Sequence, residues 1–146
     1  MAACFVVSLF NELFRQPGTL RHLQIEHKSD SDIEMILRDK IELKDLINTG
    51  NRYFPDMIKF CIDMKRRVVC IDEEMHNDME HVLFDDGSEY VDIYGGNIMI
   101  DCDPPEVVWE AHPNIERNRS LGGHGRLLTD ERTIDELSEI LFEWVK

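Results

Sequence analysis

The feature that most constrains the fold is a pair of strand-like runs separated by three basic residues. Within residues 58–64, every second residue is a large hydrophobic one, which is the period of a strand with one buried face. Val68 to Ile71 forms a second apolar run. The segment Lys65-Arg66-Arg67 between them is therefore predicted to be the tip of a β-hairpin.

Later runs predict one helix and further strands. Met75, Met79 and Leu83 share a helical face, and Asp86-Gly87-Ser88 is predicted to end that helix. Three strands are predicted after it, with Gly95-Gly96 separating the first two and a proline-containing loop, residues 101–105, separating the last two. These strands are residues 90–94, 97–100 and 107–112.

Both ends of the chain carry helical patterns. Ser31 with Glu34 and Thr133 with Glu136 fit the capping box that opens a helix, and apolar residues follow at helical spacing in both places. A helix over residues 41–47 is expected to end at Gly50. The predicted helices cover residues 5–14, 31–37, 41–47 and 134–145, whereas residues 113–126 are predicted to be an irregular loop.

Strands that arrive as hairpins favour an α+β fold. We expect a mainly antiparallel sheet of about four to five strands, a central helix, a C-terminal helix and extra N-terminal helices. Residues 41–146 are predicted to form a single domain, and residues 1–40 a helical extension packed on its core. The apolar stripe of residues 5–14 has two interpretations, docking on the core or forming a homodimer.

Charge is distributed unevenly along the chain. Residues 68–116 hold fourteen Asp and Glu and no Lys or Arg, whereas acids and bases balance in the remainder. An acidic surface of this kind predicts a cation or a basic partner and disfavours nucleic acid. No membrane span or signal peptide is recognised, and the four cysteines lack close pairing, so we expect a cytoplasmic protein with free thiols.

A divalent metal ion is the one cofactor that the sequence suggests. His76 and Glu80 are one helical turn apart, and Asp78 lies between them in the sequence. An imidazole and carboxylates at this spacing are able to chelate a cation. The alternative is a solvent-facing acidic helix whose first residues complement the helix dipole.

Bases return in the loop from Glu116 to Arg126, together with three glycines. Arginine guanidinium groups and exposed backbone N–H groups suit an anionic ligand. The same arginines also suit pairing with the chain's own carboxylates. Both interpretations remain open.

Several short motifs, in this order and spacing, resemble a small prokaryotic family of unknown function. They are Phe54-x-Asp56-Met57-x-Lys59, Ile62-Asp63, Met75-His76-x-Asp78-x-Glu80, Asp86-Gly87-Ser88, Tyr94-Gly95-x-Asn97, Asn114-Ile115 and Asn118-Arg119-Ser120. The resemblance runs from about Ile41 to the end of the chain and departs from the family pattern at Tyr94 and Glu116-Arg117. It implies a set of candidate ligand-binding positions, namely Ser88, Tyr94, Asn97, Asn118 and Arg119, beside the metal candidates.

Two functions are predicted. The first is an acidic cytosolic binding or regulatory module that engages a basic protein partner. The alternative is a metal-dependent enzyme in which His76 and Glu80 hold the ion, with Asp78 as a general base and Arg119 positioning an anionic substrate.

Overall fold

The computed structural model describes residues 35–50 and 53–146, and these form an α+β fold. Their sheet is antiparallel and contains four strands in the order β2-β1-β3-β4. The strands are β1 (Met57–Asp63), β2 (Val68–Ile71), β3 (Ile93–Met99) and β4 (Glu106–Pro113). The predicted α+β class, with a mainly antiparallel sheet, is confirmed.

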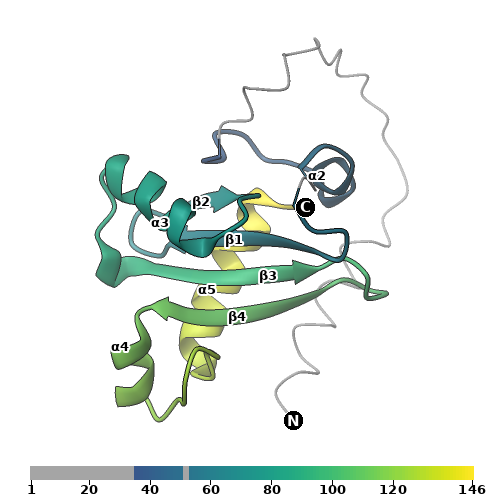
Figure 1. Ribbon diagram of the computed structural model, residues 1–146. Coiled ribbons are helices and arrows are strands. Elements are labelled where there is room, and N and C mark those ends of the chain that lie inside the picture. The colour runs from purple at the N-terminus through teal and green to yellow at the C-terminus, as the bar shows by residue number, and fades with distance from the viewer. Residues whose placement is uncertain (1–34, 51–52) are drawn as a thin grey trace.

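The sheet consists of two hairpins joined by a helical connection. β1 and β2 pair around the basic tip that the sequence predicted, and β3 pairs with β4. Between them, α3 (His76–Asp85) and the 3₁₀ turn η1 (Tyr90–Asp92) carry the chain from the β2 edge back to β1. α3 therefore lies over one face of the sheet, while α5 (Glu131–Trp144) lies across the other (Figure 1).

Alternation along the strands separates two clusters of buried residues. On one face, Phe60, Tyr94 and Trp109 join residues of α5 and of α2 (Leu43–Gly50) in the main hydrophobic core. On the other face, Cys61 and Cys70 pack with Met79 and Leu83 of α3. Burial of apolar side chains on both faces is the main favourable contribution to folding.

Beneath α3, the two cysteines are directly opposite each other in the β1–β2 ladder and are free thiols, as predicted. Desolvation by burial raises the pKa of both, that of Cys70 to about 12, so the reactive thiolate form is disfavoured. They behave as small apolar side chains.

Gly95 and Gly96 lie inside one continuous strand, so the predicted break between two strands is wrong. A Cβ on Gly95 would lie 3.1 Å from the His76 ring, and one on Gly96 would overlap the ring of Phe60. The glycines therefore make room for one ring on each face of the sheet. A register irregularity at Tyr94/Gly95 marks the same place.

Three further predictions need correction. Ile36 forms a β-bridge to Cys70, so residues 35–37 extend the sheet edge and the helix predicted over 31–37 is absent from its described end. The segment 113–126 contains the short helix α4 (Ile115–Ser120). The N-cap of α5 is Asp130 and not the predicted Thr133, so the helix begins at Glu131. The Asp130 side chain accepts from the N–H of Thr133, and Asp is a preferred N-cap residue.

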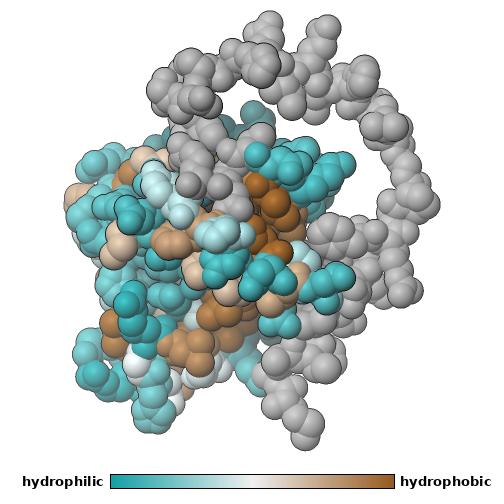
Figure 2. All heavy atoms as spheres, turned by 45° about the vertical axis from the view of Figure 1, so that its right-hand side comes forward, coloured by the Kyte–Doolittle hydropathy of each residue, from teal (hydrophilic) through white to brown (hydrophobic). Residues whose placement is uncertain are grey.

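The helix predicted over 5–14 and the homodimer through it lie outside the described residues, as does most of the extension 1–40. Among the residues described, no helix is long and apolar enough to cross a membrane. The surface turned forward in Figure 2 is largely hydrophilic, with a band of hydrophobic side chains running through it.

Candidate functional site

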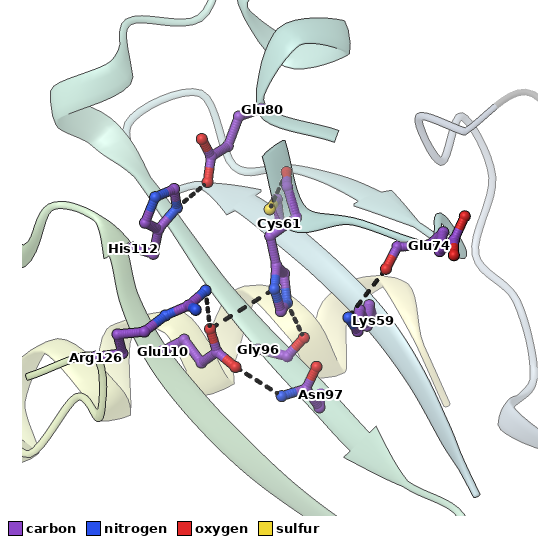
Figure 3. A network of polar contacts seen from close by, with 10 residues as sticks. Lys59, Cys61, Glu74, Glu80, Gly96, Asn97, Glu110, His112 and Arg126 are labelled. Atoms are coloured by element: carbon purple, nitrogen blue, oxygen red, sulfur yellow. Dashed lines mark hydrogen bonds and ion pairs between the residues drawn. The ribbon is translucent and has the colours of Figure 1, made fainter. Parts of the chain in front are cut away.

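The candidate site lies on the face of the sheet that α3 covers. Side chains on this face alternate with those of the main core, and on β3 and β4 they include Asn97, Glu110 and His112. α3 adds His76 and Glu80, which are buried rather than turned to solvent. These five side chains, called the polar network below, lie between α3 and the sheet in two sets of contacts, Glu80 with His112, and Glu110 with Asn97 and His76 (Figure 3).

The shortest contact in this network joins Glu80 and His112. Nδ1 of His112 lies 2.6 Å from Oε1 of Glu80. Because an ionised carboxylate only accepts, Nδ1 carries the proton, and in the neutral ring Nε2 is then the free base. The Glu80 side chain is 3% exposed and that of His112 is 31% exposed, so a buried carboxylate orients a ring that solvent reaches.

His76 is held by the backbone of the glycine pair. Its Nε2 donates to the Gly96 carbonyl at 2.9 Å, which fixes the proton of the neutral ring on Nε2. Desolvation by burial lowers the pKa of His76, and this outweighs the opposite effects of the Gly96 carbonyl and of Glu110. Nδ1 of the neutral ring is thus an acceptor, 3.6 Å from a carboxylate oxygen of Glu110.

Glu110 is the centre of the network. Its Oε1 accepts from Nδ2 of Asn97 at 3.1 Å, and its Oε2 accepts from Nη2 of Arg126 at 3.4 Å. This leaves Oδ1 of Asn97 as a buried acceptor with no hydrogen-bond partner among the residues described. An unpaired buried acceptor is costly, because it has lost its hydrogen bonds to water without gaining a protein donor.

Arg126 reaches the network because its own backbone pairs with β4. The carbonyl of Arg126 accepts from the N–H of Ala111, and Leu127 forms a bridge with Glu110. The side chain of Arg126 is 65% exposed, so its guanidinium group stands at the solvent side of Glu110. The glycine-rich loop thus supplies a cation, at Arg126 rather than at the predicted Arg119.

The structure places the predicted metal-binding residues on two different faces of α3. His76 and Glu80 are buried with protein partners, whereas Asp78 is exposed. Within residues 35–50 and 53–146, no three His, Cys, Asp or Glu side chains form a group that could hold a metal ion. A metal at these three residues stays a prediction.

The five predicted ligand-binding residues are not brought together. Asn97 belongs to the network, whereas Tyr94 lies in the core on the other face. Ser88 is buried and accepts from Nη1 of Arg66 at 2.8 Å, next to the ion pair that Arg66 makes with Asp86. That contact ties the β1–β2 hairpin tip to the end of α3.

The remaining two lie in or beside α4. Asn118 is buried and donates to the carbonyls of Gly125 and Leu127, which shapes the loop that carries Arg126. Arg119 is exposed and pairs with Glu116 within its own helix. The interpretation of Arg119 as a partner of the chain's own carboxylates agrees with this pair.

The acidic stretch is neutralised in part by bases from outside it. Arg38 and Arg66 pair with Asp86, Lys65 lies near Glu89 and Asp92, and Arg126 pairs with Glu110. Exposed pairs of this kind contribute little stability, but they lower the local density of negative charge. Within this stretch, acids that have no ion pair with any described residue remain in two places, before and along α3 and from Asp101 to Glu106.

The sequence reasoning missed Glu110 and His112. Their signal was their spacing, since two ionisable residues two positions apart in a strand point to one face of the sheet. The strand over 107–112 is predicted from the sequence, so the position of Glu110 and His112 on one face could also be predicted. The contact of this face with α3 could not be predicted, because no local sequence pattern indicates which helix covers which face of a sheet.

One comparison finds a match. A family model described as a protein of unknown function (DUF5674) matches residues 35–142. The chain belongs to this family. The match contains every residue of the polar network, and it confirms membership of an uncharacterised family as the motifs indicated. No curated protein and no solved structure matches the chain.

Proposed function

We propose that this DUF5674 protein is an enzyme that performs acid–base chemistry on a small substrate with an anionic group. The observation that carries the proposal is the 2.6 Å contact between buried Glu80 and the solvent-accessible ring of His112. A carboxylate on Nδ1 fixes the tautomer and stabilises the imidazolium that forms when Nε2 takes a proton. The role of general base therefore moves from Asp78, as expected from sequence, to His112.

The substrate class follows from Arg126. Its guanidinium group is largely exposed and is held at one end by Glu110 and by the β4 pairing of its backbone. A planar guanidinium group binds carboxylate or phosphate oxygens through two parallel hydrogen bonds. Arg126 would hold the anionic group while His112 moves the proton, and Glu110 would position Arg126.

Asn97 supports a polar substrate. Because its amide nitrogen donates to Glu110, its unpaired Oδ1 needs a donor, such as a hydroxyl or an amine. Small movements of the neighbouring side chains would let a substrate supply that donor. The cytoplasmic location expected from the sequence stays a prediction beside this proposal.

The test is turnover of a panel of small esters, phosphate esters and amides that carry a carboxylate or phosphate group. His112→Ala should lower kcat by about 10²–10⁴-fold, the usual contribution of a general base. Arg126→Ala should mainly raise KM. His81→Ala and Arg132→Ala are the matched controls, because both side chains are exposed and outside the network.

Two results would count against the proposal. Turnover that is equal in the wild-type protein and in His112→Ala would show that the imidazole takes no part. Absence of turnover across the whole panel, with no shift of the unfolding temperature by any compound, would remove the basis for an enzyme. A basic protein partner, the function that composition favoured, would then be the stronger proposal.

A further inference from the structure

The two outer edges of the sheet are covered unequally. At the β2 edge, the N–H of Leu37 donates to the Val69 carbonyl, and the N–H of Ile71 donates to the Met35 carbonyl. At the β4 edge, the N–H of Ala111 donates to the Arg126 carbonyl, and the N–H of Leu128 donates to the Trp109 carbonyl. Pairing on this edge therefore reaches back only to Trp109.

The first part of β4 remains open. Trp109 and Ala111 direct their backbone groups outward, to the segment 126–128, so Val107 two residues earlier directs its N–H and C=O the same way. Neither group has a partner among the residues described. An exposed strand edge of this kind is a template for another extended chain.

Side chains beside this edge define the chemistry of a partner. Val108 is 37% exposed and offers an apolar contact on the sheet face. Asp101, Asp103 and Glu106 are exposed and have no ion pair with any described residue. The edge is thus an unpaired strand with an uncompensated negative charge.

The charge argues against a second copy of this chain as the partner. Two copies paired along this edge would bring the same acidic residues together, and like charges on neighbouring strands are destabilising. A strand rich in lysine or arginine would satisfy both the backbone groups and the carboxylates. Opposite charges would also speed the encounter.

We propose that the outer edge of β4 at Glu106–Val108 binds a basic, extended segment of another protein by strand addition. Four or so residues of the partner would pair with the open edge. Alternate side chains of that segment would contact Val108 on one face, and its basic residues would lie against the acidic loop before β4. This interaction is independent of the polar network and would leave its chemistry unchanged.

The experiment titrates the full-length, isotope-labelled protein with short basic peptides that alternate lysine or arginine with valine or isoleucine. The amide resonance of Val107 should shift and its hydrogen exchange should slow, because it becomes a donor to the peptide. An acidic peptide of the same pattern should not bind. A peptide methylated on the backbone nitrogens that would face β4 tests the strand pairing, and it should lose most of the affinity.

A triple variant, Asp101→Asn, Asp103→Asn and Glu106→Gln, tests the charge. It should weaken binding at low salt by about tenfold, since three exposed ion pairs are removed. The control is Glu131→Gln, Asp135→Asn and Glu139→Gln on α5, which changes net charge equally and should leave the affinity unchanged. Binding that is equal for the methylated peptide, or a whole panel that leaves Val107 unperturbed, would overturn the proposal.

Discussion

Glu80 on α3 and His112 on β4 lie 32 positions apart in the chain, yet their side chains meet at 2.6 Å. The contact joins a buried carboxylate to a ring at the surface, so it fixes the helix on the sheet and orients the imidazole at once. This double role means that stability and the proposed chemistry are coupled at Glu80. The two are separable at His112, whose ring is partly exposed.

The contact predicts the tautomer of His112. With the proton on Nδ1, Nε2 should be unprotonated in the neutral ring, and long-range nitrogen–proton NMR spectra should show this directly. Glu80→Ala removes the acceptor, so both tautomers should become populated. A neutral His112 that carries its proton on Nε2 in the wild-type protein would contradict the geometry.

His76 predicts how stability depends on pH. Burial lowers its pKa in the folded state below the value of about 6.5 in the unfolded chain. The unfolded chain therefore binds more protons in that interval, and the free energy of unfolding should decrease as pH falls from about 6.5 through the lowered pKa. Above pH 6.5 this contribution should be fully present.

The measurement is a series of urea unfolding curves between pH 4 and pH 8. His76→Gln removes the titrating group. The difference in the free energy of unfolding between variant and wild type then reports the titration of His76, on which Glu80, Glu110 and Lys59 also act. The difference should change with pH only below about 6.5. A constant difference across the range would show that His76 does not titrate as described.

The glycine pair predicts a contrast between two neighbouring substitutions. Gly96→Ala would place a methyl group in the ring of Phe60, and overpacking of this kind costs about 1–3 kcal/mol. Gly95→Ala would instead press on His76, so its effect should appear in the NMR signals of that ring. The double variant Gly96→Ala with Phe60→Leu should be less destabilised than the sum of the single changes. Strict additivity would mean that the two residues do not share the space.

Ser88 predicts a structural role for a residue that the motifs marked as ligand-binding. Ser88→Ala removes the acceptor for Arg66, and the free energy of unfolding should fall by about 1 kcal/mol. Ser120→Ala is the matched control, because that hydroxyl is exposed on α4 and should cost less. Denaturant midpoints measure both, and equal effects would argue that the contact with Arg66 is unimportant.

Local patterns predicted most of the fold. Alternation identified the β1–β2 hairpin and β4, and the apolar stripe of α5 identified the helix that covers the main core. These features depend on residues close together in the chain. The incorrect prediction at Gly95-Gly96 has a different origin. The two glycines make room for the rings of His76 on α3 and Phe60 on β1, which are distant from them in the sequence.

The candidate site was predicted less completely for the same reason. His76 and Glu80 were selected from their helical spacing, and Asn97 from a motif, and all three belong to the polar network. Their partners on β4 and the arginine that reaches the network depend on contacts across the sheet. Spacing within α3 suggested either a chelating pair or a solvent-facing acidic helix, whereas the structure buries both residues and gives each its own partner on the neighbouring strands.

In the middle of β3, neighbouring residues face opposite sides of the sheet and are therefore under different constraints. In the middle of this strand, Gly95 and Asn97 lie at the polar network, whereas Gly96 and Ile98 lie in the main core. A substitution at Gly95 or Asn97 should therefore disturb the polar network, and one at Gly96 or Ile98 the packing of the main core. In sequences of relatives, we expect the first set to preserve polar chemistry and the second to preserve only volume.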